Sequence, residues 1–194
     1  MGGCEKPLLS IGHSTLVEVA VAAIAPHVAA LALNVRLTSM PLYDEFRRRG
    51  LFLYADPVCE ETGPLGGIIG GLEWLQTLPS EYDWLATVPC DCPFLSGDLV
   101  PTLSVCHAPE IRRPIVAVGD GHIQSLCALW PRQLLNRLKL EVAKGATRSV
   151  RSVLAAMNAI VCPVNCDFFN VNTPADLAIA EKRFREHRTS VQVE

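Results

Sequence analysis

The sequence predicts a single α/β domain with a mostly parallel sheet. In the first half of the chain, short apolar segments alternate with longer helical ones, the order that produces parallel strands joined by helices. In the second half, Gly119-Asp120-Gly121 separates two apolar segments. This spacing indicates a β-hairpin, and so an antiparallel or mixed edge. The 194 residues suffice for one domain with a full core and are too few for two typical ones.

The elements of the first half follow from periodicity and from helix start and stop signals. We expect a buried helix over 15–25 with Ser14 or Thr15 as its N-cap, a strand over 28–35, a helix over 42–49 that Gly50 ends, a strand over 51–55, and a helix from about residue 65 to the residue before Pro79.

The second half is read in the same way. We expect a strand over 83–88, a helix over 96–103 with Ser96 as a candidate cap, hairpin strands over 114–118 and 124–129, helices over 131–140 and 149–157, extended segments over 160–164 and 167–169, and a last helix over 174–188 capped by Thr173.

Composition excludes several classes of protein. A hydrophobic content of 49% with 19% charged residues indicates a globular chain. The net charge of −3 gives no electrostatic reason to expect nucleic acid as a partner. No uncharged apolar run of about 20 residues predicts a membrane span, and the first residues do not resemble a secretion signal. We therefore expect a cytoplasmic protein whose eight cysteines are free thiols, mostly small buried side chains rather than zinc ligands.

Two carboxylates directly follow predicted strands. Asp91 lies between Pro89 and Pro93 after the strand over 83–88, and Asp56 follows the strand over 51–55. Ligands of α/β folds bind beyond the carboxyl ends of the strands, so both side chains would border one ligand site. We interpret Asp91 as a metal ligand in preference to a turn residue. The interpretation of Asp56 is less specific, because Asp-Pro also starts ordinary turns.

Two further segments could bind an anion. The glycine-rich segment 63–67, which includes Gly66, opens a helix, and glycines at a helix N-terminus allow phosphate groups to approach the backbone. Lys6 follows two glycines and precedes a proline, a setting in which lysine commonly neutralises phosphates. Each pattern is weak alone, since glycines also permit tight packing and a terminal lysine is often only solvated.

Asn170 and Asn172 flank a valine just before the predicted C-terminal helix. From the residues alone, turn formation and helix capping explain them as well as ligand binding does.

Taken together, these segments resemble the molybdenum cofactor guanylyltransferases, bacterial enzymes with a three-layer α/β/α, Rossmann-like nucleotidyltransferase fold. The resemblance rests on the order of several blocks. These are the loop end before Lys6, the strand 32–36 with Asn34, Asp56 followed by Gly-Pro-Leu-Gly-Gly-Ile, Pro-Cys-Asp-Cys-Pro-Phe at 89–94, and Phe-Asn-Val-Asn-Thr-Pro-Ala-Asp-Leu at 169–177.

The resemblance implies transfer of GMP from GTP to molybdopterin or its molybdenum-bearing form, with loss of pyrophosphate. It assigns Mg²⁺ to Asp91 and GTP phosphates to Lys6, which makes these the expected catalytic residues. Asn34, Asp56 and Gly66 would help to bind the nucleotide. Asn170 and Asn172 would lie on the pterin side. GTP and the pterin are the implied partners, with a molybdoenzyme or its chaperone as a further one.

The sequence departs from the family at its start. The family's first strand and most of its phosphate loop have no counterpart, and Met1 aligns with a methionine inside that loop. Either the natural protein is longer by roughly twenty residues, one strand plus its loop, or the chain is shortened and inactive. The first interpretation is favoured because every downstream block is intact.

Three alternative functions remain open at this point. A cytidylyltransferase for the same cofactor would share the fold and the metal, and the residues alone do not indicate the base. A truncated, non-catalytic protein could bind the cofactor or a partner enzyme. A sugar-phosphate nucleotidyltransferase is less favoured, because the block over 169–177 fits the pterin enzymes better.

Overall fold

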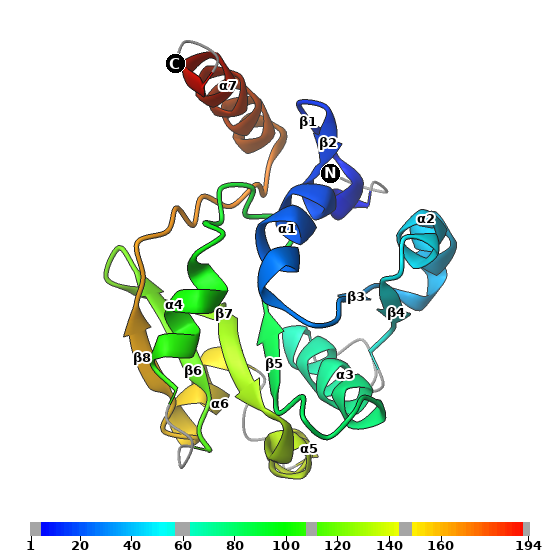
Figure 1. Ribbon diagram of the computed structural model, residues 1–194, viewed down its shortest axis with the longest axis vertical. Coiled ribbons are helices and arrows are strands. Elements are labelled where there is room, and N and C mark those ends of the chain that lie inside the picture. The colour runs from blue at the N-terminus through cyan, green and yellow to red at the C-terminus, as the bar shows by residue number, and fades with distance from the viewer. Residues whose placement is uncertain (1–4, 57–62, 108–111, 144–148, 192–194) are drawn as a thin grey trace.

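A computed structural model describes residues 5–56, 63–107, 112–143 and 149–191 (Figure 1). The strands are β1 (Ser10–Ile11), β2 (Ser14–Thr15), β3 (Ala32–Asn34), β4 (Phe52–Tyr54), β5 (Trp84–Thr87), β6 (Ile115–Gly119), β7 (His122–Pro131) and β8 (Ile160–Pro163).

The α-helices are α1 (Leu16–Ile24), α2 (Asp44–Arg48), α3 (Pro64–Thr77), α4 (Leu99–Val105), α5 (Leu135–Ala143), α6 (Val150–Ala156) and α7 (Pro174–Val191). Short 3-10 helices are η1 (Lys6–Leu8), η2 (Ala25–His27), η3 (Leu37–Tyr43) and η5 (Arg132–Leu134). In the described part of the chain, no helix is both long enough and apolar enough to cross a membrane.

The strands of the core form two separate sheets rather than one. β3 and β4 pair in parallel, and a four-stranded sheet has the order β5-β7-β6-β8. Within the larger sheet β7 is antiparallel to β5 and β6, whereas β6 and β8 are parallel. The fold class is α/β as predicted, and its strand pairing is more mixed than the expected mostly parallel sheet. No described strand joins β3 to β5.

Helices cover both faces of the four-stranded sheet. Alternate residues of β7 point to opposite faces, so Ala128 and Trp130 pack with α3, α5 and α6, whereas Cys127 and Leu129 pack with α4. All four side chains are buried. A smaller cluster packs α1 and η3 against β3 and β4. These clusters make the three layers of the fold, with helices on each side of the strands.

Several local signals act as predicted. The Thr15 hydroxyl accepts a hydrogen bond from the Glu18 N–H, and the Glu18 carboxylate accepts one from the Thr15 N–H, so a capping box begins α1. Asp120 and Gly121 both have positive φ in the turn between β6 and β7, which suits a two-residue hairpin loop. Ser149, expected as the first residue of the helix over 149–157, is instead its N-cap and accepts a hydrogen bond from the N–H of Ser152.

Other boundaries differ from prediction. The strand over 28–35 is reduced to β3, and the segment 167–169 forms no strand. Asp98, not Ser96, is the N-cap of α4. Pro131 ends β7 instead of beginning a helix. It fits there because the neighbouring hydrogen bond to β5 comes from the Arg132 N–H to the Asp83 carbonyl, so the strand position of Pro131 needs no donor.

The expectation that every cysteine is a free thiol is wrong for one pair. Cys106, the C-cap of α4, and Cys162 of β8 form a disulfide that ties this helix to the edge strand of the larger sheet. Their 56-residue separation hides the pairing from local patterns. Among the described cysteines, Cys90, Cys92, Cys127 and Cys166 are free.

Candidate functional site

Three of the predicted residues meet at one ammonium group. The Lys6 Nζ donates hydrogen bonds to Asp91 Oδ2 and to Asn172 Oδ1, each over 2.7 Å. The Lys6 and Asp91 side chains keep 29% and 26% of their surface exposed, so a ligand can reach both. An ammonium group has three donors, and these two contacts leave one for an anionic oxygen. The cluster Lys6–Asp91–Asn172 thus combines a carboxylate that could bind a metal ion with an ammonium group that could bind a phosphate.

The position of Asp91 is fixed by backbone contacts as well as by Lys6. It follows β5 by four residues, and its carbonyl oxygen accepts a hydrogen bond from the Val171 N–H over 2.8 Å. Val171 is completely buried against α7 and β1. The segment 169–173 is therefore held beside the loop after β5, which brings Asn172 to Lys6 and leaves Asn170 exposed on the other side of Val171.

A second cluster lies at the end of β3. The Asn34 Nδ2 donates to Asp56 Oδ1 over 2.7 Å, so these two predicted residues also contact each other. A Cβ at Gly67 would lie 2.7 Å from Asn34 Oδ1, and only glycine leaves room there. Gly67, rather than the predicted Gly66, is the glycine of α3 that contacts this cluster. Gly66 is buried, and its N–H donates to the Gly63 carbonyl.

One cavity of about 860 Å³ connects the clusters. Lys6, Asn34, Gly67 and Asp91 line one polar end of it. The remaining lining is mostly apolar but includes the ionisable residues Glu81, Asp83, His107 and Arg112. Asp56 and Asn172 are connected to these lining residues by hydrogen bonds: Asp56 with Asn34, and Asn172 with Lys6. Thus five predicted residues gather in two groups near the carboxyl ends of β3 and β5, although these strands belong to separate sheets: Lys6, Asn34, Asp56, Asp91 and Asn172. Gly66 and Asn170 make none of these contacts.

Sequence reasoning missed the residue that positions Lys6. The carboxylate of Glu5 accepts hydrogen bonds from the Ser39 hydroxyl and, over 3.3 Å, from the Tyr43 hydroxyl. Both partners are buried in η3. Burial and the nearby Glu5 charge raise the pKa of Tyr43, so it remains a hydrogen-bond donor. The local signal was only an acidic residue beside a lysine, which gives no indication of a partner more than thirty positions away.

A further contact holds the start of α7. The Asp176 carboxylate accepts hydrogen bonds from the N–H groups of Asn172, over 3.0 Å, and Thr173, over 2.7 Å. The Asp176 N–H donates to the Thr173 hydroxyl in return, so Thr173 is the cap that was predicted. Hydrogen bonds from the Thr173 side chain and from these two N–H groups lower the pKa of Asp176. This cap orients the backbone that carries Asn172.

Comparison with known proteins identifies the family. The family profile described as "MobA-like NTP transferase domain" matches residues 1–161. The molybdenum cofactor guanylyltransferase of Rhodopseudomonas palustris strain BisB5 is 36% identical over 186 residues, which cover 94% of this chain and 87% of that protein. The protein of the same name from Nitrobacter hamburgensis is 33% identical, with 94% and 87% covered. This chain belongs to the molybdenum cofactor guanylyltransferase family.

Solved structures agree with the fold of this guanylyltransferase family member. Molybdopterin-guanine dinucleotide biosynthesis protein A from Archaeoglobus fulgidus superposes with a TM-score of 0.73 at 19% identity, covering 95% of this chain and 92% of that one. The 4-diphosphocytidyl-2C-methyl-D-erythritol synthase of Anaerococcus prevotii gives a TM-score of 0.69 at 9% identity, covering 92% and 93%. The nucleotidyltransferase fold expected from the sequence is therefore confirmed.

The environment of the two cysteines beside Asp91 favours their thiol form. Burial, followed by the negative charge of Asp91, raises the pKa of Cys90 to about 11 and that of Cys92 to about 12. Both thiols are consequently protonated at neutral pH, and a thiolate is the reactive form. The Cys92 Sγ donates a weak hydrogen bond to the Phe168 carbonyl oxygen over 3.9 Å.

The donor set around Asp91 fits a single Mg²⁺. This ion commonly takes one or two protein carboxylates and fills its other positions with water and substrate phosphates. Lys6 donates to Asp91 Oδ2, whereas Oδ1 accepts a long, weak hydrogen bond from the Cys92 Sγ at 4.0 Å, so Oδ1 is the oxygen better placed to bind a cation. In the described part of the chain no group of three or more His, Cys, Asp or Glu residues forms a metal cage, so any Mg²⁺ here depends on substrate oxygens.

Proposed function

We propose that this chain transfers GMP from GTP to molybdopterin or its molybdenum-bearing form, with Lys6, Asp91 and Asn172 at the reacting phosphates. The terminal phosphate oxygen of the pterin forms a bond to the α-phosphorus of GTP. The bond from that phosphorus to the β-phosphate oxygen breaks, and pyrophosphate leaves. The meeting of Lys6, Asp91 and Asn172 through two 2.7 Å hydrogen bonds is the observation that supports this assignment most directly.

Two polyanions must approach each other in this reaction, so positioning and charge neutralisation dominate the barrier. Lys6 holds a phosphate oxygen with its remaining N–H. Its position is set by Glu5, which is anchored to η3. No covalent intermediate with the protein is required, in agreement with the protonated state of Cys90 and Cys92.

Asp91 Oδ1 is the group that would hold Mg²⁺. When bound, the ion supplies positive charge to the phosphate oxygens of the substrate. The Asp91 backbone stays in place through its hydrogen bond with Val171, which keeps the carboxylate at the cavity mouth. Asn34 and Asp56 form the nucleoside side of the site: Asn34 lines the same cavity as Lys6 and Asp91, and it donates a hydrogen bond to Asp56. Asn170 and Asn172 form the pterin side, with a molybdoenzyme or its chaperone as the receiver of the product.

The test is a guanylyl-transfer assay with purified protein, molybdopterin, Mg²⁺ and either GTP or CTP. We expect product with GTP. In Asp91→Asn the rate of guanylyl transfer should fall by about 100-fold or more, the size typical of removing one charge-stabilising group. Asp98→Asn is the matched control, because Asp98 is an exposed aspartate seven positions later, at the N-cap of α4, where its side chain makes no capping hydrogen bond. Full transfer by Asp91→Asn, or equal transfer from CTP, would contradict the proposal.

A further inference from the structure

Tyr54, the last residue of β4, is hydrogen-bonded to a helix. Its hydroxyl donates to the Gly67 carbonyl oxygen of α3 over 2.9 Å. A Cβ at Gly71, one turn further along α3, would lie only 3.0 Å from the same hydroxyl oxygen. A helical carbonyl that accepts from the N–H four residues later keeps a second lone pair for a side chain. The Tyr54 hydroxyl therefore fits against α3 without breaking the helix, where the glycines leave room for it.

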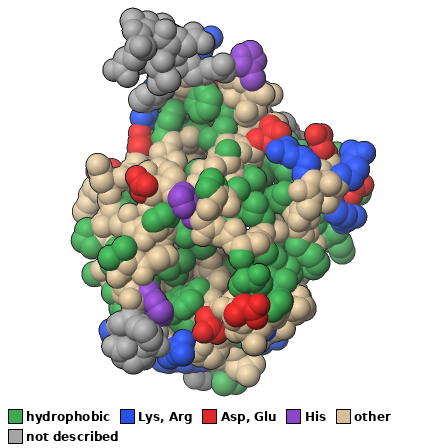
Figure 2. Space-filling view, viewed as in Figure 1, with side chains coloured by type: hydrophobic (Ala, Val, Ile, Leu, Met, Phe, Trp, Pro, Cys, Tyr) green, Lys and Arg blue, Asp and Glu red, His purple; other side chains and the backbone are tan. Residues whose placement is uncertain are grey.

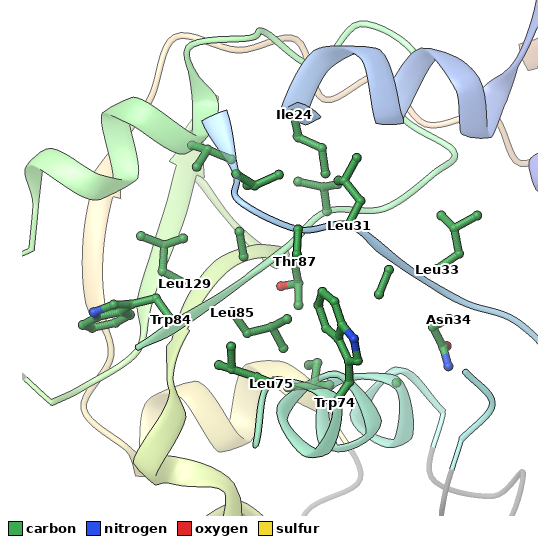
Figure 3. Close-up of a pocket in the computed structure, with 18 of the residues that line it drawn as sticks. Ile24, Leu31, Leu33, Asn34, Trp74, Leu75, Trp84, Leu85, Thr87 and Leu129 are labelled. Atoms are coloured by element: carbon green, nitrogen blue, oxygen red, sulfur yellow. The ribbon is translucent and has the colours of Figure 1, made fainter. Parts of the chain in front are cut away.

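Tyr54 adjoins the cluster of Asn34 and Asp56. It pairs in register with Asn34 across β3 and β4, and its carbonyl oxygen accepts a hydrogen bond from the Val35 N–H over 2.9 Å. A Cβ at Gly67 would lie 2.7 Å from Asn34 Oδ1, so the glycine that accepts from Tyr54 also lies directly against Asn34. Figure 3 shows Asn34 beside α3 at the border of the cavity. One glycine of α3 thus connects the Tyr54 hydroxyl with the Asn34 side chain.

The same helix contacts both sheets. The Cβ that Gly71 would place 3.0 Å from the Tyr54 hydroxyl would also lie 2.8 Å from Leu85 Cδ2 of β5. Leu33 and Leu85 approach the cavity from the two sheets, and Trp74 approaches it from α3 (Figure 3). Hydrophobic side chains are visible at the surface in the middle of the molecule, where Figure 1 places β3 and β5 (Figure 2). Because the cavity separates β3 from β5, their spacing depends on elements such as α3 that contact both sheets.

A second aromatic residue of β4 packs on α3 without a hydrogen bond. The rings of Phe52 and Trp74 are stacked, with 5.8 Å between their centroids and 13° between their planes. Residues two apart on a strand point to the same face, so Phe52 and Tyr54 both face α3. Removal of the Tyr54 hydroxyl leaves this stacking in place. The hydroxyl is therefore a contact that can be removed without removing the packing of β4 on α3.

The state of the hydroxyl excludes a role in proton transfer at neutral pH. Burial, followed by the negative charge of Asp56, raises the pKa of Tyr54. The hydroxyl keeps its proton and remains a hydrogen-bond donor to the Gly67 carbonyl. It holds a position in the structure rather than moving a proton.

We propose that Tyr54 is a positioning residue for GTP, whose hydroxyl holds α3 against β4 so that Asn34 and Asp56 keep the geometry that binds the nucleoside. This role rests on the proposed function, in which Asn34 and Asp56 bind the nucleoside. Tyr54 acts through Gly67 and Asn34. Without the hydroxyl, α3 can move relative to β4, and the Asn34 amide loses the fixed surface that keeps it directed at Asp56.

The experiment compares the unsubstituted protein with Tyr54→Phe, which removes only the hydroxyl oxygen. Tyr82→Phe is the matched control, because Tyr82 is also a partly buried tyrosine and lies beyond the C-terminal end of α3, away from Gly67. Calorimetry gives the Kd for GTP in the absence of the pterin. Guanylyl-transfer kinetics give kcat and separate KM values for GTP and molybdopterin, and thermal unfolding verifies that each variant is folded.

We expect Tyr54→Phe to weaken GTP binding by about three- to tenfold, the size of one hydrogen bond, and to raise the KM for GTP by the same factor. The kcat at saturating GTP and the KM for molybdopterin should be unchanged, and Tyr82→Phe should match the unsubstituted protein. Tyr54→Phe combined with Gly67→Ala should bind GTP no more weakly than the weaker single variant, because both changes act on Asn34.

The positioning role would be overturned if the unsubstituted protein bound GTP no more tightly than Tyr54→Phe. An equal rise in both KM values would also overturn it, since that indicates general damage to the fold, and so would additive losses in the double variant. If the unsubstituted protein binds GTP but transfers no GMP, the proposed function alone is contradicted. The calorimetric comparison of Tyr54→Phe with the unsubstituted protein then still decides the role of Tyr54.

Discussion

The ion pair between Lys6 and Asp91 should matter far more to turnover than to stability. Lys6→Met keeps the length of the side chain and removes its charge and donors. The lost contacts are one ion pair about a quarter exposed and one hydrogen bond to Asn172. A pair so accessible to solvent contributes about 0.2–1 kcal/mol, and the exposed hydrogen bond from the ammonium group to the Asn172 carbonyl oxygen about 1 kcal/mol. We therefore expect a loss of about 1–2 kcal/mol in the free energy of unfolding.

The effect on catalysis should be larger, because the same ammonium group meets charge that develops on the transferred phosphate. Removal of one such donor typically lowers kcat by about 100–1000-fold, equivalent to roughly 2.7–4 kcal/mol. The measurements are urea unfolding and guanylyl-transfer kinetics on Lys6→Met, Asp91→Asn and the double variant. The losses in turnover should be strongly non-additive, since the two groups act on the same phosphates.

Lys182→Met is the control, because Lys182 is exposed on α7 and pairs only loosely with Glu186, at 3.9 Å. It should retain both stability and turnover. If Lys6→Met unfolds more readily by several kcal/mol while kcat/KM per folded molecule stays unchanged, Lys6 is a structural residue and its assignment to phosphate is refuted.

Three more predictions concern single contacts. Gly67→Ala should leave the free energy of unfolding within about 1 kcal/mol of the unsubstituted protein, because alanine's better helix propensity offsets the displacement of the Asn34 side chain. The same substitution should weaken GTP binding, measured by calorimetry. An unchanged affinity for GTP would count against a nucleotide-binding role of Asn34 and Asp56. Cys106→Ser should lower the stability of the oxidised protein by up to about 4 kcal/mol in thermal unfolding, and the addition of reductant should then have no further effect. The lowered pKa of Asp176 implies a contribution to stability that is present above the unfolded-state pKa and is lost as the pH falls through the folded-state pKa. Asp176→Asn should therefore make the free energy of unfolding less dependent on pH in the acidic range. An unchanged pH dependence would contradict the role of the cap with Thr173.

Local chemistry explains which elements were predicted correctly from sequence. The N-cap at Thr15, one of the two candidates, and the Asp-Gly turn after β6 are set by neighbouring residues, so their local patterns were sufficient. Pro131 was assigned to a helix because proline is frequent at a helix start, whereas its actual position depends on the register with β5. Such register is a tertiary property that local periodicity does not contain.

The same distinction between local and tertiary signals applies to the candidate site. The positions of Asp91 and Asp56 after strands could be predicted from alternating apolar segments. The contact between Lys6 and Asn172 joins residues 166 positions apart, and nothing in the sequence predicted it. The family resemblance had placed these two residues at different substrates. The Cys106–Cys162 disulfide and the anchoring of Glu5 carried no local signal. Gly67 could have been separated from Gly66 only by knowing which face of α3 meets Asn34.

The hydrogen bond from the Val171 N–H to the Asp91 carbonyl has a thermodynamic consequence for the two substrates. One short backbone segment carries the side chains expected on the pterin side, and through Val171 and Lys6 it is attached directly to the carboxylate on the nucleotide side. Displacement of that segment by one ligand changes the binding free energy of the other, and linkage makes the change equal in both directions. Binding of the pterin should thus change the affinity for GTP by the same factor by which binding of GTP changes the affinity for the pterin.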